Sequence, residues 1–275
     1  MRVSVLGSGS RGNAILVDAD GDRILVDAGF SARDLARRMA LVGVDPDLLQ
    51  GIVITHEHSD HTRGMGVFAR RHGTPLYLTE GTRVACADLL RGSETVVPYR
   101  AGIPFSLGPF TIEPFLTVHD AREPVGVAVS HSGSGARLGV ATDLGRPTAG
   151  IRHALARCDV LVLEANHDEV LLQAAPYPWS VKSRISSSHG HLSNRAAAQF
   201  AAELFHDGLL AVVLAHLSAE SNRPEMARRV VARALKKAGF KGVLQVARQD
   251  EPLPFLDVSE LRQRNRPSQL TLFGS

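Results

Sequence analysis

The chain has 275 residues, of which 44% are hydrophobic and 21% are charged, the balance of an ordinary globular protein. Its formal charge of +3 is compatible with an anionic partner but is too small to identify one. No run approaches the roughly 20 apolar residues of a membrane helix, and the first apolar stretch is too short for a secretory leader. We therefore expect a cytoplasmic protein with no membrane partner, in which Cys86 and Cys158 are reduced packing residues.

Short apolar runs and turn residues place the elements of the first half of the chain. The Asp-Gly pair at 20–21 separates two strand-like runs, which is the pattern of a β-hairpin. Ser31 is a suitable N-cap for a helix through Val42, because Leu35, Met39 and Val42 share one helical face. The other elements expected here are strands at 3–6, 51–54 and 75–78, and helices at 64–72 and 80–90.

The second half begins with strand-like periodicity between residues 95 and 141. Ser193 is a suitable N-cap for a helix to about Leu204, and Pro224 begins a helix that runs to Ala238. The segment 175–179 is expected to be a proline-broken loop. The remaining elements are a helix at 147–156 and strands at 159–163, 209–215 and 244–246.

No linker rich in proline, glycine or serine divides the chain. Strands occur in two groups with helices inserted in each half, which favours two packed sheets with helices outside over a single parallel sheet. The sequence therefore predicts one α/β (α+β) domain over residues 1–257. Residues 258–275 are expected to be a loose, polar C-terminal tail.

The glycine-rich segment Gly7-Ser-Gly-Ser-Arg-Gly12 matches the G-x-G-x-x-G pattern of dinucleotide-binding folds. That function requires the loop to open a helix, whereas the residues that follow predict a strand and a hairpin. Two interpretations remain open. The loop is either a tight turn that needs glycine at positive φ, or a site where Ser8, Ser10 and Asn13 contact substrate.

Six residues from His56 to His61 hold the densest group of ligand-type side chains, and they follow a short buried strand. His56 and His58 are two residues apart, so in an extended segment they point the same way, while Asp60 and His61 can face a neighbouring position. Imidazole and carboxylate bind Zn²⁺ or Mn²⁺, and Fe²⁺ is a further alternative. Four such residues suit two ions better than one.

The pattern H-x-H-x-D-H resembles the signature of the metallo-β-lactamase superfamily, and further pieces follow in the family's order through about residue 257. Asp27 resembles the first motif, which supports the ligand loop by hydrogen bonds. The resemblance implies a four-layer αββα sandwich. It also implies that one metal is held by His56, His58 and His119, the second by Asp60, His61 and His216, and that Asp143 bridges them.

A narrower resemblance points to the YycJ/WalJ group of this superfamily, bacterial exodeoxyribonucleases that act from the 5′ end. It rests on the segments at 7–13, 164–168, 190–194 and 216–222. Gly9 departs from the serine often found there, which weakens a phosphate contact at that position. The resemblance implies a metal-dependent phosphodiesterase, and a DNA substrate rather than RNA; the oligomeric state, monomer or dimer, stays open.

Outside the ligand set, His191 lies beside Ser193 at a helix start, a setting suited to anion binding. We expect both to contact substrate, with His191 protonating the leaving oxygen and Asp60 or Asp143 orienting the nucleophile. The alternative is a simple capping loop. His167 either faces the metals or caps a helix. Four cations could attract phosphate, or be plain surface charges: Arg122, Arg146, Lys182 and Arg184.

Two other functions compete with this prediction. A hydrolase of the same fold could act on a thioester or a lactam, because a fold does not determine its substrate. A diiron redox protein is the second alternative, but His58 favours a hydrolytic site over the acidic substitutions of that class.

Overall fold

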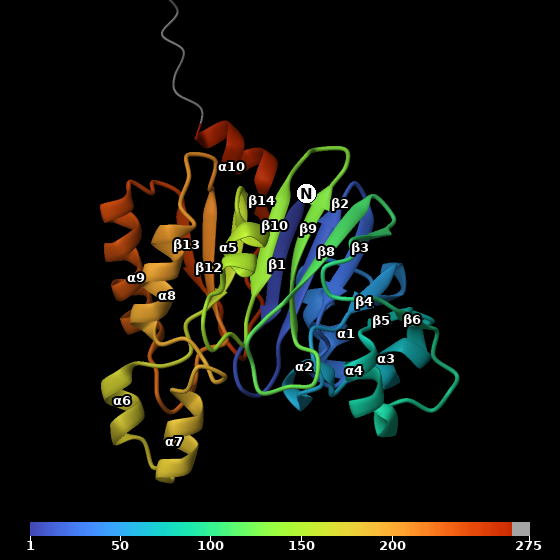
Figure 1. The fold of residues 1–275 in the computed structure, drawn as a ribbon. Helices are drawn as coiled ribbons and strands as arrows, with labels where there is room; N and C mark the ends of the chain where they lie inside the picture. Colours follow the sequence, from blue (N-terminus) through green and yellow to red (C-terminus); the bar gives the residue numbers. More distant parts are fainter. Residues whose placement is uncertain (266–275) are drawn as a thin grey trace, which may run out of the picture.

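The computed structural model describes residues 1–265, and within that range two mixed sheets of seven strands each pack face to face (Figure 1). The first sheet has the order β14-β1-β2-β3-β4-β5-β6, antiparallel as far as β3 and parallel beyond it. Its strands are β1 (Arg2–Gly7), β2 (Ala14–Ala19), β3 (Asp22–Val26), β4 (Gly51–Val53), β5 (Leu76–Leu78), β6 (Val96–Pro98) and β14 (Leu256–Asp257).

The second sheet has the order β13-β12-β11-β10-β9-β8-β7. It is antiparallel from β7 to β10 and parallel from β10 to β13, so the carboxyl ends of four neighbouring strands meet at one edge. Its strands are β7 (Phe105–Leu107), β8 (Phe110–Leu116), β9 (Val125–His131), β10 (Arg137–Ala141), β11 (Val160–Glu164), β12 (Ala211–Ala215) and β13 (Val243–Val246).

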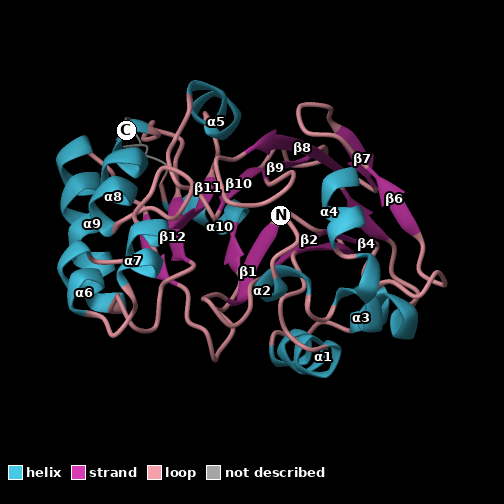
Figure 2. Ribbon diagram, turned by 60° about the horizontal axis from the view of Figure 1, so that its bottom comes forward, coloured by secondary structure: helices cyan, strands magenta, loops and turns pink. Residues whose placement is uncertain are grey.

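Helices cover the outer faces of both sheets, which gives the expected four layers (Figure 2). Side chains of α1 and α3 pack on the first sheet, and those of α5, α8 and α9 pack on the second. The helices are α1 (Ala32–Leu41), α2 (Ser59–Thr62), α3 (Met65–His72), α4 (Glu80–Ala85), α5 (Ala149–Leu155), α6 (Glu169–Ala174), α7 (Trp179–Ile185), α8 (Asn194–Glu203), α9 (Pro224–Ala238) and α10 (Val258–Arg264), with 3₁₀ turns at Pro46–Leu48 and Ala87–Leu89.

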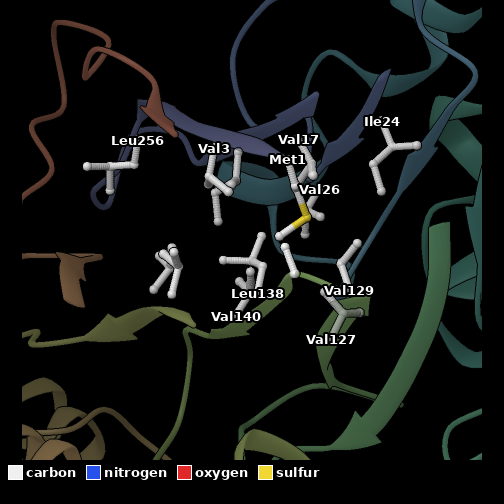
Figure 3. Packing of buried hydrophobic residues seen from close by; sticks show 14 of the residues in the cluster. Met1, Val3, Val17, Ile24, Val26, Val127, Val129, Leu138, Val140 and Leu256 are labelled. Atoms are coloured by element: carbon white, nitrogen blue, oxygen red, sulfur yellow. The ribbon is translucent and has the colours of Figure 1, made fainter. Parts of the chain in front are cut away.

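The central core lies between the sheets and follows the two-residue period of strands (Figure 3). Val3 and Val17 of the first sheet face Leu138 and Val140 of the second, while Leu16 points to the helix-covered side. Strands at the centre of the sheets, such as β11 and β12, are buried at every position, because both faces of each sheet are covered. This explains why continuous apolar runs marked them in the sequence, whereas β8 keeps an alternating pattern.

Several local predictions are confirmed. Asp20 and Gly21 have φ of 54° and 96°, the conformation of a type I′ hairpin turn between β2 and β3. Ser31 accepts a hydrogen bond from the Asp34 amide and caps α1, and Pro224 begins α9.

No helix within residues 1–265 is long and apolar enough to cross a membrane.

The prediction of a loose segment after Asp257 is wrong for residues 258–264. They form α10, because Val258 and Leu261 are buried in the central core and Arg262 donates two hydrogen bonds to the carboxylate of Asp159. The rest of the predicted tail, residues 266–275, lies outside the described residues. Helices α6 and α7 were not predicted. They flank the proline-containing loop, and Trp179, expected within that loop, is the first residue of α7.

Candidate metal centre

The candidate ligands follow strand ends at a single edge of the sandwich. The loop that begins at His56 leaves β4, His119 follows β8, and Asp143 follows β10. Glu164 is the last residue of β11, and His216 comes directly after β12. The parallel register of β10, β11 and β12 brings these last three ends side by side, so residues far apart in sequence converge.

The chain turns sharply where it delivers these side chains. Asp27, Asp143 and His216 have φ of 65°, 55° and 53°, in the left-handed region that non-glycine residues rarely adopt. Such conformations persist only where surrounding contacts hold them, and they cluster at functional sites. Position 29 requires glycine for a steric reason, because a Cβ atom there would lie 1.7 Å from the carbonyl oxygen of Asp60.

The first group of ligand-type atoms comes from His56, His58, His119 and Asp143, all within 4.8 Å of one another. His119 Nε2 lies 3.2 Å from His58 Nδ1 and 3.5 Å from Asp143 Oδ1, and His56 Nε2 lies 4.0 Å from the same oxygen. Three imidazoles and one carboxylate at these distances form a donor set of the kind that holds a divalent transition metal.

The second group comes from Asp60, His61 and His216, and a further overlapping group joins Asp143 and His216 to Glu164 and His191. His216 Nε2 lies 3.2 Å from Asp60 Oδ2, and His61 Nε2 lies 3.5 Å from the same oxygen. Asp143 joins the groups, because its Oδ2 lies 3.1 Å from His61 Nε2 while its Oδ1 faces the first group. The structure thus assembles the seven predicted ligand residues into two adjacent groups with Asp143 between them.

Hydrogen bonds from outside orient the rings. His61 Nδ1 lies 2.8 Å from Asp27 Oδ2, and His119 Nδ1 lies 3.2 Å from the Gly190 carbonyl. His216 Nδ1 lies 2.8 Å from Glu164 Oε1, which leaves Nε2 of all three rings facing the cluster. Metal-binding histidines characteristically use the second nitrogen in this way. Asp27 supports the ligand loop, as the resemblance implied, and also accepts from the Thr55 amide at 2.8 Å.

The electrostatics of the cluster suit a bound cation. Burial favours the neutral form of His61, but the carboxylates of Asp143, Asp27 and Asp60 outweigh it and raise the pKa of His61 well above its usual value. Burial likewise opposes ionisation of Asp143, yet the surrounding histidines hold the pKa of Asp143 well below its ordinary range. Within residues 1–265, the buried His56 Nε2 has no hydrogen-bond partner, and Asp143 Oδ2 lies near His61 Nε2 without the alignment of a hydrogen bond. Divalent metals would give these atoms a partner, so the residues fit the group.

A cavity of about 450 Å³ opens on the cluster. His58, Asp60 and His119 form part of its lining, and side chains of α7 form another part. Of the four cations expected to attract phosphate, Arg184 lines the cavity.

Comparison with known proteins agrees with this geometry. The profile of a family described as "Beta-lactamase superfamily domain" matches residues 22–216. The chain belongs to this superfamily. Exodeoxyribonuclease YycJ of Bacillus anthracis is 35% identical over 242 residues, covering 87% of this chain and 91% of its own.

A second curated relative and a solved structure are also similar to this chain. Exodeoxyribonuclease WalJ of Streptococcus pneumoniae is 33% identical and covers 86% of this chain and 89% of its own. Among solved structures, the metallo-β-lactamase fold protein YhfI of Bacillus subtilis aligns with a TM-score of 0.71 over 92% of this chain and 98% of that one, at 19% identity. The superfamily fold predicted from the sequence is therefore confirmed.

The glycine-rich loop positions two of the candidate ligands, His216 and Asp60, through hydrogen bonds inside the protein. Ser8 Oγ donates to Asn13 Oδ1 at 2.7 Å and accepts from the His216 amide at 2.8 Å. Asn13 Nδ2 lies 3.3 Å from Asp60 Oδ2, and both Ser8 and Asn13 are buried. Their predicted contact with substrate is replaced by these internal bonds, while Ser10 does line the cavity. The Gly12 amide donates to the Gly9 carbonyl, so the tight-turn interpretation also describes the backbone.

Glu164 is a candidate functional residue that the sequence did not single out. Its side chain is fully buried, and Oε1 lies 2.8 Å from Nδ1 of both His191 and His216. The amides of Leu144 and Leu192 donate to Oε2. Burial raises the pKa of Glu164, but His191 and His216 outweigh it and lower the pKa to about 2. A carboxylate at the end of an apolar strand, as at Asp143, was the signal that could have revealed it.

The remaining predicted residues are placed as follows. His191 lines the cavity, and its bond to Glu164 leaves Nε2 as its free nitrogen. Ser193 caps α8 by accepting from the Ala196 amide and donates to Glu169, so its hydroxyl is used inside the protein. His167 is buried and belongs to none of the groups of ligand-type side chains among the described residues. Its backbone carbonyl accepts a hydrogen bond from the Asn194 amide.

Proposed function

We propose that this protein is a binuclear metal-dependent phosphodiesterase that removes nucleotides from the 5′ end of DNA. The observation that carries the proposal is the pair of ligand groups joined by Asp143, with His191, held by the buried Glu164, lining the same cavity. The 35% identity to a named exodeoxyribonuclease over most of both chains supports the reaction class and favours DNA over RNA.

The residues that would hold the two ions are those of the two groups. His56, His58 and His119 would hold one ion, Asp60, His61 and His216 the other, and Asp143 both. Zn²⁺ or Mn²⁺ suits a set of imidazoles and carboxylates, and Fe²⁺ is also compatible. When bound, such ions lower the pKa of water and neutralise the charge that develops on a phosphate.

The side chains of the chain itself supply orientation and proton transfer. Asp60 lines the cavity and Asp143 lies between the groups, so their carboxylates accept hydrogen bonds from the attacking water and fix its direction. His191 exposes Nε2 at the rim, because Glu164 occupies Nδ1. This nitrogen donates a proton to the leaving oxygen, and the buried carboxylate of Glu164 stabilises the charged ring that precedes that transfer.

The deciding experiment is hydrolysis of 5′-labelled single- and double-stranded DNA and RNA oligonucleotides with Zn²⁺ or Mn²⁺, beside an Asp143→Ala control. We expect metal-dependent release of mononucleotides from DNA that the control lacks, while circular dichroism shows both proteins folded. Absence of cleavage by protein carrying two confirmed ions would refute the proposal. Turnover of a thioester under the same conditions would instead assign the small-molecule hydrolase alternative.

A further inference from the structure

We propose that α7 and the loop before it form a binding site for an unpaired nucleobase. Tyr177 is the stacking surface, and Arg184 contacts the phosphate on the far side of that nucleotide. The inference rests on the proposed nuclease function and deepens it, because it requires a single-stranded end in the cavity.

Helix α7 lies beside the candidate metal centre. Tyr177, Val181, Arg184 and Ile185 line the same cavity as the candidate metal ligands. Residues 181, 184 and 185 are spaced i, i+3 and i+4, so one face of α7 is turned toward the cluster. Figures 1 and 2 show α6 and α7 together at the end of the sandwich below α8 and α9.

The chemistry of this wall differs from that of the rest of the cavity. Histidines and carboxylates surround the metal groups, whereas the loop before α7 contributes the ring of Tyr177 and α7 contributes two aliphatic side chains and a guanidinium. Apart from histidine, Tyr177 is the one aromatic residue among the described residues that line this cavity. Arg184 is exposed and forms no ion pair within the described part of the chain. Its charge is therefore available to an anionic ligand.

A nucleotide has the complementary arrangement. Its base presents a flat apolar face and its phosphates carry the negative charge, and single-stranded nucleic acids are held by aromatic stacking together with basic side chains. A cavity of about 450 Å³ lies within the range of roughly 300–1,000 Å³ found for small-ligand sites. A base inside a duplex has both faces covered by its neighbours and cannot stack on Tyr177, so the wall favours an unpaired end, whose base is free to turn onto the ring.

The test compares 3′-fluorescein-labelled single-stranded DNA that carries either a normal or an abasic 5′-terminal nucleotide. Affinity is measured by fluorescence anisotropy in an Asp143→Ala background, and KM and kcat are measured in the otherwise unchanged protein. We expect Tyr177→Ala to weaken binding and raise KM roughly 5- to 100-fold for the normal end, since stacking contributes about that much. The abasic end should be unaffected by the substitution.

Matched variants distinguish the loss of stacking from a structural disturbance of α7 and the loop before it. Tyr177→Phe keeps the ring and should behave as the parent, whereas Tyr177→Leu keeps apolar bulk without a ring and should resemble alanine. Trp179→Ala is the control, because Trp179 lies two residues after Tyr177 at the start of α7, is 79% exposed and is not among the described cavity-lining residues. Arg184→Gln should weaken both ends and reduce the salt dependence of binding.

Two results would overturn the inference while leaving the nuclease assignment intact. One is an equal loss on normal and abasic ends in Tyr177→Ala. The other is a loss in Trp179→Ala as large as that in Tyr177→Ala. If the parent protein with bound metal cleaves no nucleic acid at all, the proposed function fails and this inference fails with it.

Discussion

Asp27 Oδ2 lies 2.8 Å from His61 Nδ1 in a pair that is sealed from solvent. The same carboxylate also accepts from the Thr55 amide and hydroxyl, so one side chain holds both the start of the ligand loop and one of its rings. The geometry of the ligand loop therefore depends on a residue that would not touch the metal.

Replacing Asp27 by asparagine should weaken metal binding by about 10- to 100-fold, because a neutral amide orients the ring of His61 without supplying charge to it. Competition with a chromogenic chelator measures this affinity. Asp250→Asn is the matched control, since the Asp250 side chain is 84% exposed. Unchanged affinity in Asp27→Asn would show that the ring needs no carboxylate partner.

Glu164→Gln should reduce turnover by roughly 10²- to 10⁴-fold, the usual contribution of a positioned proton donor, with a smaller change in KM. The substitution removes the anionic acceptor that His191 and His216 share. Single-turnover kinetics on a 5′-labelled oligonucleotide would measure the chemical step directly. Metal content should be determined alongside, because loss of one ion would assign the effect to His216, and retention of both would assign it to His191.

The parts of the site that the sequence predicted are those encoded locally. His56, His58, Asp60 and His61 lie within six residues after an apolar strand, so spacing alone indicated a ligand loop. His119, Asp143 and His216, which stand alone in the sequence, were predicted to be ligands because each matched a family motif. Strand identity was also accessible, since continuous apolar runs are typical of sheets covered on both faces.

The parts that the sequence could not predict depend on tertiary contacts. Nothing in the glycine-rich loop indicates that Ser8 and Asn13 turn inward to the His216 amide and Asp60. Glu164 becomes informative only when the parallel register of β11 and β12 brings it beside His216. Helix α10 looked polar because only Val258 and Leu261 reach the core, too short a repeat to establish a period.

Both cysteine thiols should resist alkylation in the native protein. Burial raises the pKa of Cys86 to about 11 and that of Cys158 to about 12, from an ordinary value of 9.0. The folded state therefore disfavours the thiolate, so this contribution to stability is complete below pH 9 and declines as the pH rises toward 12. Iodoacetamide labelling at pH 8 should be slow in buffer and complete in urea. Rapid stoichiometric labelling of native protein would contradict the burial of both thiols.

Helix α10 should depend on Arg262 for part of its attachment. Arg262 forms two hydrogen bonds with Asp159, at 3.0 and 3.1 Å, and donates to the Ser134 carbonyl, which ties α10 to the second sheet. The Arg262 side chain is 39% exposed, so solvent screening limits the effect, and Arg262→Ala should lower the free energy of unfolding by about 1 kcal/mol.

Arg264→Ala is the matched control on the same helix, because the Arg264 side chain is 73% exposed and, within residues 1–265, its ion pair is with the exposed Glu260. Urea unfolding followed by circular dichroism measures both variants. Arg264→Ala should leave the midpoint unchanged, since exposed pairs of this kind contribute little. If Arg262→Ala were equally silent, the burial of Val258 and Leu261 alone would account for the docking of α10.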